Sequence, residues 1–319
     1  MQSTTELQQD LETLRNTKGF STYKEARLID QLIVAKSIEI LEEDNPITVR
    51  RLHYLLAQKL SAEYKNNLKQ YDKLTSLITI ARRKGDVPYE WIADPTRAVH
   101  TFVVWNNVAK YAESARSWYE RDRWQSQDTR VEVWVEKDSL LSVLHKTCMD
   151  YQVTLRSLHG QGSNTLAYET AKAIAPRKKN EKPQHPDKKF HVLYFGDMDP
   201  CGEQIPTTFK DSVEQILENH FDYYNGIELH RLGFNYDDFE TVNVESIDNK
   251  PKDKQLAGYL ARHGEDAKFA EVEALPKSLM IERIELELRL LIDNKAWAKE
   301  TKQETLDKKK ITAALKGLK

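Results

Sequence analysis

The sequence predicts two parts of different fold class: an all-α amino-terminal part and an α/β part built on a parallel sheet. Three observations lead to this. Apolar residues recur at helical spacing in the first third of the 319 residues. From residue 130 onward, β-branched runs alternate with helical segments, which is typical of a parallel sheet with right-handed crossovers. No apolar run is long enough to cross a bilayer, so we expect no membrane partner.

The composition is that of a globular protein whose charges are unevenly distributed. Hydrophobic residues make up 39% and charged residues 31%, which excludes a disordered chain. The net charge is −2, but residues 46–100 carry ten Lys or Arg against five Asp or Glu, so the remainder carries −7. This suggests one part that faces DNA and one that holds cations, although an ordinary solvated face explains the count equally well. Cys148 and Cys201 form no metal or disulfide pattern, which fits a cytoplasmic, nucleoid-associated protein.

The amino-terminal third begins with helices. We expect them over residues 5–16 and 22–44, within an amino-terminal helical segment of residues 1–44. A further helix is expected over residues 48–60, because Thr48 is a good N-cap. Its apolar residues recur at spacings of three and four and form one stripe: Val49, Leu52, Leu56 and Leu60.

The next segment predicts a DNA-docking unit. A helix over residues 71–85 ends in three cations followed by a glycine, a regular helix ending. Residues 86–97 contain two prolines and are interpreted as a short strand or wing. Helix, turn, helix and wing together predict a winged-helix (CAP-like) DNA-binding domain over residues 45–97. The cations expected to contact DNA from the end of its last helix are Arg82, Arg83 and Lys84.

Tyr54 lies off the apolar stripe of the 48–60 helix. At helical spacing it points about 150° away from that stripe, and its helical neighbours include Arg50 and Arg51. A tyrosine beside two cations is well placed to meet a phosphate. Packing against another element is nevertheless the usual role of a tyrosine, and the chain has 14 of them.

The rest of the chain predicts a helical connector over residues 98–128, an α/β domain with a carboxy-terminal extension over 129–298, and a basic tail over 299–319. The connector is expected to be one long helix as far as about residue 124. The tail is interpreted as a helix that touches DNA or a partner, or as a frayed end. Strands of the α/β domain are expected over residues 130–137, 153–163, 190–197 and 226–234.

Two of these strands end in acids. The first ends at Glu136, and the third is followed by Asp197 and Asp199. Parallel strands share one carboxyl edge, where ligands bind, and carboxylates that converge there favour a bound cation. Few, hard oxygen ligands suit Mg²⁺ or Mn²⁺, and the pattern indicates a phosphoryl-transfer site. A plainer interpretation also holds for Asp199, because Asp followed by Pro200 is a typical helix start.

These segments resemble a known family. VWVEKDSL (residues 133–140) and LYFGDMDPCG (193–202) are similar to the Toprim domain, the metal-binding module of topoisomerases, primases and related nucleases. Preceded by RRLHY (50–54), they resemble the A subunit of topoisomerase VI, the meiotic double-strand-break enzyme and, still more, the stand-alone mini-A proteins of phages and plasmids. The resemblance covers roughly residues 45–290 and includes EVEALP at 271–276.

The resemblance implies an enzyme that cleaves double-stranded DNA. The family pattern Arg-x-x-Tyr-Tyr aligns Arg50 and the nucleophile Tyr54, while His53 replaces the first tyrosine. Glu136, Asp197 and Asp199 would bind Mg²⁺ or Mn²⁺, with Glu136 counted as catalytic. In the family's homodimer each tyrosine works with the acids of the other subunit. We expect Arg50 or Arg51 to hold the phosphate and Lys137 either to touch DNA or to be a plain surface lysine.

Other functions stay open. A hydrolytic nuclease would use the same acids with water as the nucleophile, and Tyr54 would then be structural. A DNA-binding adaptor with a degenerate site is a second alternative, and a phosphatase that uses Asp197 a third. No Gly-rich phosphate loop of the Walker type is present, so strand passage would need a separate ATPase subunit of the B type.

Overall fold

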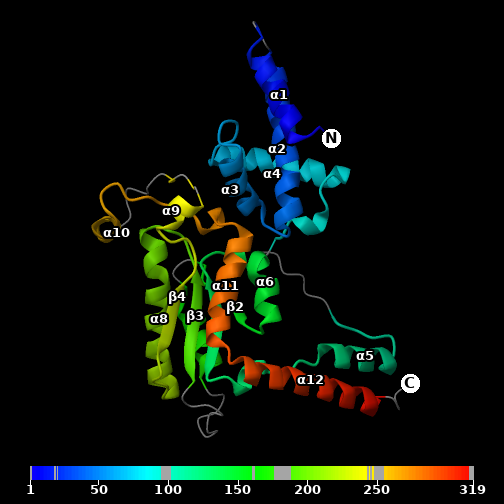
Figure 1. Cartoon of the computed structure of the whole chain (residues 1–319), viewed down its shortest axis with the longest axis vertical. Coiled ribbons are helices and arrows are strands. Elements are labelled where there is room, and N and C mark those ends of the chain that lie inside the picture. Colours follow the sequence, from blue (N-terminus) through cyan, green and yellow to red (C-terminus); the bar gives the residue numbers. More distant parts are fainter. Residues whose placement is uncertain are drawn as a thin grey trace.

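The structure, a computed structural model, describes residues 2–17, 19, 21–94, 102–159, 162–175, 188–242, 244, 246–247 and 255–315. It confirms the coarse prediction of a helical amino-terminal part followed by a parallel sheet flanked by helices (Figure 1). The amino-terminal helices stand above one end of the sheet, and the long carboxy-terminal helix lies near the other end.

Four helices form the amino-terminal part. Each begins at a Ser, Thr or Asn whose side chain accepts a hydrogen bond from the backbone of the first turn, as the sequence leads one to expect of Thr48. Gly85 ends the last of them in the left-handed conformation, with φ of 85°. The helices are α1 (Thr4–Arg15), α2 (Thr22–Asp44), α3 (Val49–Lys59) and α4 (Leu68–Lys84).

The expected wing is not formed by the part of this segment that the structure describes. Between residues 86 and 94 the chain makes one short 3-10 helix, η1 (Tyr89–Trp91), and a single parallel bridge between Ile92 and Ile47. Residues 95–97 lie outside the described residues. Helices α3 and α4 are therefore present, while their assembly with a wing into a winged-helix unit remains a prediction.

The connector is not one helix. Its described part contains α5 (Val108–Trp118) and η2 (Arg123–Ser126), separated by extended residues. Asp122 accounts for the break, because its side chain accepts a hydrogen bond from the Trp124 backbone and so starts a new helical turn. Residues 98–101 lie outside the described residues.

The sheet has four parallel strands in the order β2-β1-β3-β4. They are β1 (Thr129–Val135), β2 (Thr154–Ser157), β3 (Lys189–Phe195) and β4 (Ile227–Arg231). The chain steps outward from β1 to β2 and then returns to β3 on the other side of β1. The strand order thus reverses between β1 and β3, and in such sheets the carboxyl ends at the reversal form a ligand-binding crevice. Glu136 and Asp197 follow these two strands.

Helices cover both faces of the sheet, as its nearly continuous apolar strands require. Alternate residues of β1 and β3 divide between two apolar clusters: Trp134 and Tyr194 pack with the helices on one face, whereas Val133 and Phe195 belong to the larger cluster on the other. The first face carries α7 (Asn164–Ile174) and α8 (Pro200–Phe221), and the second carries α6 (Leu141–Asp150) and α11 (Lys277–Leu291). The short elements of this part are η3 (Asp138–Leu140), α9 (Asp238–Thr241), α10 (Leu256–His263) and η4 (Val272–Ala274).

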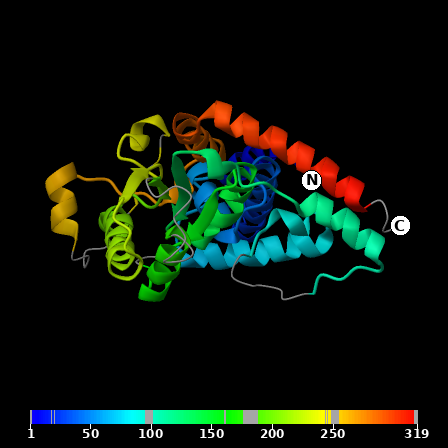
Figure 2. The same ribbon diagram turned by 90° about the horizontal axis from the view of Figure 1, so that it is seen from below.

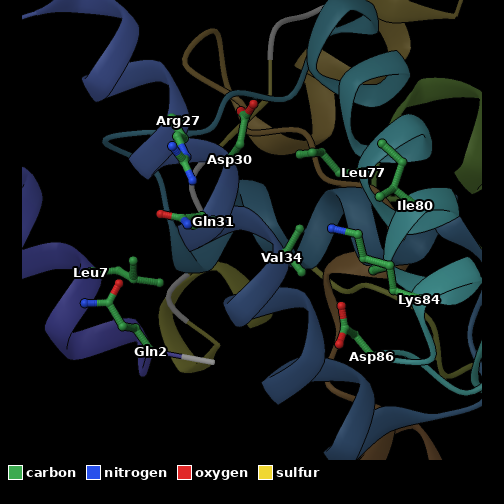
Figure 3. A pocket seen from close by; sticks show the side chains of 11 residues that line it. Gln2, Leu7, Arg27, Asp30, Gln31, Val34, Leu77, Ile80, Lys84 and Asp86 are labelled. Atoms are coloured by element: carbon green, nitrogen blue, oxygen red, sulfur yellow. The ribbon is translucent and has the colours of Figure 1, made fainter.

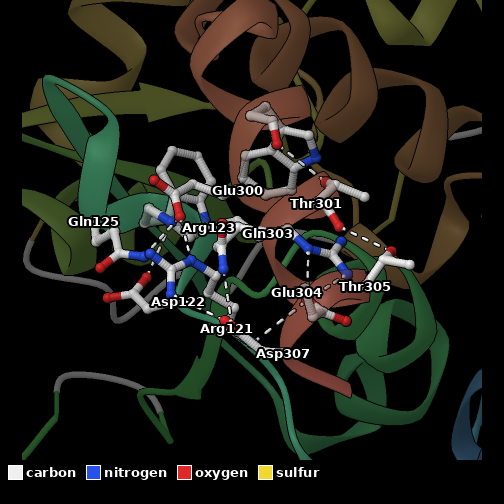
Figure 4. Close-up of polar contacts among 12 residues, drawn as sticks. Arg121, Asp122, Arg123, Gln125, Glu300, Thr301, Gln303, Glu304, Thr305 and Asp307 are labelled. Carbon is white, nitrogen blue, oxygen red and sulfur yellow. Dashed lines mark hydrogen bonds and ion pairs between the residues drawn. The ribbon is translucent and has the colours of Figure 1, made fainter. Parts of the chain in front are cut away.

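The basic tail is part of a packed helix, α12 (Asn294–Leu315), which lies alongside α5 (Figure 2). Arg121 pairs with Glu300 and Asp307, and Arg123 pairs with Glu304 at 3.3 Å (Figure 4). Glu300 and Glu304 are buried, so this helix is tied to the connector through its acids. A frayed end is thereby excluded as far as residue 315.

Candidate functional site

The first two predicted acids lie side by side at the carboxyl edge of the sheet. The Glu136 backbone N–H donates to the Phe195 carbonyl at 2.9 Å, and Glu136 Oε2 accepts from the Asp197 backbone N–H at 2.9 Å. The Tyr194 hydroxyl donates to the same oxygen at 3.2 Å. Both carboxylates are buried, which is costly for charged groups unless cations or donors surround them.

The structure adds two acids that the sequence did not single out. The segment that includes η4 crosses the sheet edge, where the Val272 backbone N–H donates to Asp197 Oδ1 at 2.9 Å. This brings Glu271 and Glu273 beside Asp197. Among the described residues, one oxygen from each of these three carboxylates falls within 4.8 Å of the others. Both acids belong to the EVEALP segment, but no local sequence pattern shows that a segment 74 residues after Asp197 packs against it.

Lys137 occupies the centre of this acidic group. Its Nζ lies 2.7 Å from Asp197 Oδ2 and 3.1 Å from Glu273 Oε2, and it also pairs with Glu271. Burial lowers the pKa of Lys137, but the carboxylates of Asp197 and Glu273 outweigh this effect and hold it above its usual value. Lys137 is therefore not a plain surface lysine, because its ammonium group pairs with three carboxylates in this conformation. A contact between Lys137 and DNA stays a prediction.

Asp199 has a structural role in this conformation. Its Oδ1 accepts from the Gly202 backbone N–H at 2.6 Å and caps α8, with Pro200 at the first helical position. The plainer sequence interpretation is therefore confirmed. Of the predicted ligands Glu136, Asp197 and Asp199, only Asp197 belongs to the close carboxylate group in the described part of the chain.

Burial raises the pKa of Asp197 to about 7, and the nearby negative charges of Glu136 and Glu273 contribute to the increase, while Lys137 opposes it. The ordinary value is 3.8, so the folded state takes up a proton that the unfolded chain releases. Ionisation of Asp197 therefore does not reduce the stability of the folded state below pH of about 4. Its full destabilising effect is present above pH of about 7.

We expect a pH-dependent stability difference between the metal-free protein and its Asp197→Asn variant. The melting temperature of the variant, relative to that of the unaltered protein, should rise as the pH increases from about 4 to about 7. Circular dichroism melts in the presence of a chelator measure this difference, and Asp211→Asn on the exposed face of α8 is the control. A difference that stays constant with pH would contradict the burial of an ionisable Asp197.

Helix α3 packs against the same edge segment through Arg51. The guanidinium is fully buried: Nη1 donates to the Glu273 carbonyl at 3.1 Å and Nη2 to the Leu275 carbonyl at 2.9 Å. Asp44 supplies a carboxylate at 3.5 Å. The prediction that Arg51 contacts DNA is therefore wrong, because this side chain fastens the amino-terminal part to the sheet.

Tyr54 lies three residues after Arg51 and thus on the same face of α3. The side chain is half-buried, with its ring 5.6 Å from that of His53. Burial raises the pKa of Tyr54, and so do the charges of Glu273 and Asp197, while Lys137 and Arg50 lower it. The phenol is thus within electrostatic reach of the acidic group of its own chain.

Replacing Arg50 and replacing Arg51 are expected to have different effects on stability and on DNA binding. Arg51→Met should lower the free energy of unfolding by about 3–5 kcal/mol, because it leaves Asp44 and two buried carbonyls without their partner. The matched Arg50→Met changes an exposed side chain, so it should leave stability nearly unchanged and weaken DNA binding instead. Urea unfolding and DNA titrations at several salt concentrations measure the two effects. Equal stability losses would contradict this assignment.

The three cations at the end of α4 differ in whether they contact other residues or are exposed. Arg82 lies over the Tyr89 ring, 4.4 Å from its centroid, and donates to the Tyr89 carbonyl at 3.0 Å, whereas Arg83 and Lys84 are exposed. Lys84 also lines a hollow of about 280 Å³ between α1, α2 and α4 (Figure 3). Neither Tyr54 nor the acidic group lines that hollow, so it is separate from the candidate site.

Comparisons with protein-family models, with curated proteins and with solved structures found no match. Among the described residues, no helix combines the length and the apolar character that crossing a membrane requires.

Proposed function

We propose that this protein cleaves double-stranded DNA by transesterification, with Tyr54 as the nucleophile and Mg²⁺ or Mn²⁺ at the acidic group. One observation carries the proposal: α3 is fastened through Arg51 to the segment that bears Glu271 and Glu273, so that the phenol and the acids influence each other electrostatically. Phosphoryl transfer needs a nucleophile and a metal site that can act on the same phosphate, and this arrangement is compatible with that requirement.

The chemistry assigned to Tyr54 is a displacement at phosphorus. The phenol oxygen forms a bond to the phosphorus of a DNA phosphodiester, and the bond to the 3′ oxygen breaks, so that one strand end leaves as a hydroxyl. Because its pKa is raised, the phenol carries its proton at neutral pH and must lose it during attack. The acids whose charges act on the phenol, Glu273 and Asp197, are the candidates to receive it. The phosphotyrosyl bond keeps the energy needed for resealing.

The acidic group fits a hard divalent ion. Its donors are carboxylate oxygens within 4.8 Å of one another, contributed by Asp197, Glu271 and Glu273, and a cation already lies among them in the form of the Lys137 ammonium. A bound Mg²⁺ or Mn²⁺ would stabilise negative charge on the reacting phosphate. Glu136 holds the backbone of Asp197, while Asp199 would have to release the α8 cap to become a ligand.

The exposed cations support a DNA partner. Arg50, Arg83 and Lys84 are solvent-accessible, and phosphate contacts from such side chains give salt-dependent binding with little sequence preference. A homodimer would carry two sites and cut both strands. Strand passage would require a separate ATPase subunit.

The test is incubation with supercoiled plasmid and Mg²⁺ or Mn²⁺, quenched by detergent with and without protease. We expect nicked and linear DNA that carries covalently bound protein until protease is added. Cleaved DNA without bound protein would instead identify a hydrolytic nuclease. The raised pKa of Tyr54, which disfavours the phenolate, is the observation that favours this second candidate. Binding without any cleavage would indicate an adaptor.

A further inference from the structure

A second group of metal-ligating side chains lies on β3 and β4. His191 Nδ1 is 3.0 Å from His230 Nε2 and 3.4 Å from Glu228 Oε2. One ligand atom from each of the three residues falls within 4.8 Å of the others. His191 is buried, Glu228 is exposed and His230 is partly exposed to solvent.

The strand pairing fixes this arrangement. His191 of β3 stands opposite Glu228 of β4, and His230 follows Glu228 by two residues, so that all three side chains point to the same face of the sheet. That face is the one covered by α11, from which Glu287 reaches within 3.6 Å of His230 Nδ1. The three side chains of the group thus come from two paired strands, and α11 adds Glu287 beside them.

We infer that His191, Glu228 and His230 form a binding site for a transition-metal cation of the Zn²⁺ type. Two imidazoles and one carboxylate are a regular ligand set for Zn²⁺ and leave a fourth position for water. In a tetrahedral zinc site neighbouring ligand atoms are about 3.3 Å apart, close to the separations of 3.0 and 3.4 Å found here. Mg²⁺, which prefers oxygen ligands, does not suit this set.

One further observation supports a metal at this place. Glu287 lies at the ring nitrogen of His230 that faces away from the group, the usual position of a carboxylate that orients a metal-bound histidine.

The site is separate from the acidic group and does not depend on the proposed function. His191 lies near the start of β3, whereas Asp197 follows its end, so at about 3.3 Å per residue the two are roughly 20 Å apart. A metal here would join the edge strand β4 to β3, with Glu287 bringing in α11. Binding of a metal ion here should therefore raise the free energy of unfolding of the protein.

The test is Zn²⁺ and Co²⁺ binding to the full chain after removal of metals with a chelator. We expect one tightly bound Zn²⁺ per chain, a higher melting temperature, and a visible absorption band of tetrahedral Co²⁺. The Asp197→Asn variant should keep this site, because only the acidic group is altered. Glu287→Gln should weaken Zn²⁺ binding by about 10- to 100-fold.

Ligand variants decide the assignment. His230→Gln at a partly exposed position and Glu228→Gln at an exposed one should each weaken Zn²⁺ binding by more than about 100-fold. His145→Gln, on the exposed face of α6, should not change it. Circular dichroism confirms that each variant is folded. The inference is overturned if the protein binds no Zn²⁺, or if binding survives His230→Gln and Glu228→Gln but disappears in Asp197→Asn.

Discussion

The Tyr54→Phe variant is expected to form no covalent adduct with DNA and to lose at least about 10³-fold in cleavage rate. The change removes only the hydroxyl that would attack the phosphorus, and the loss of a nucleophile abolishes the covalent route. The aromatic ring remains next to His53, so the variant should fold. Detergent-quenched plasmid cleavage, with and without protease, measures both the adduct and the rate.

Tyr71→Phe is the matched control for this experiment. Tyr71 belongs to the neighbouring helix α4, and its ring also packs against His53, at 5.5 Å. Tyr71 belongs to a different helix from the proposed nucleophile, so its variant should cleave DNA normally. Cleavage that persists in Tyr54→Phe at an unchanged rate would assign the reaction to a water nucleophile and make Tyr54 a packing residue.

The second large effect is expected at Asp197. The Asp197→Asn variant should lose at least about 100-fold in metal-dependent cleavage, because Asp197 is the acid shared by the predicted ligand set and the observed carboxylate group. A Mn²⁺ titration of the cleavage rate separates weaker binding of the ion from slower chemistry. Asp211→Asn serves again as the exposed control. Full activity of Asp197→Asn would remove the acidic group from the mechanism.

Mixing the two inactive variants tests which chain supplies which half of the site. The family resemblance implies that each tyrosine acts with the acids of the other subunit, whereas the electrostatic influence of Glu273 and Asp197 on Tyr54 arises within one chain. If both halves come from one chain, a mixture of Tyr54→Phe and Asp197→Asn stays inactive. If the halves come from two chains of a dimer, mixed dimers regain one active site, and the within-chain assignment is contradicted.

Local signals predicted most of the fold. Thr48 and Gly85 mark helix ends through their own side chain or backbone freedom, and both act as the sequence indicates. The alternation of strands and helices after residue 130 likewise predicts the parallel sheet, because each element is defined by residues adjacent in sequence. Glu136 and Asp197 were found in the same way, from the strand ends.

Long-range contacts determine the features that the sequence did not reveal. Glu271 and Glu273 join the site only because the segment around η4 folds back over the sheet edge. Arg51 is buried for the same reason, since the two carbonyls that it binds lie more than 200 residues away in the sequence. The local sequence shows only that Arg51 is a helical neighbour of Tyr54, which is equally consistent with a phosphate ligand. Asp199 had two valid local interpretations, and only the contact with Gly202 decides between them in this conformation.

The central claim is that the Tyr54 oxygen forms the bond to DNA. Its most direct test is peptide mapping of the trapped complex after nuclease trimming and proteolysis. We expect a nucleotide attached to the peptide that contains Tyr54, and a free 3′ hydroxyl on the cleaved strand. A nucleotide on a different residue, or cleaved DNA with no modified peptide, would contradict the claim.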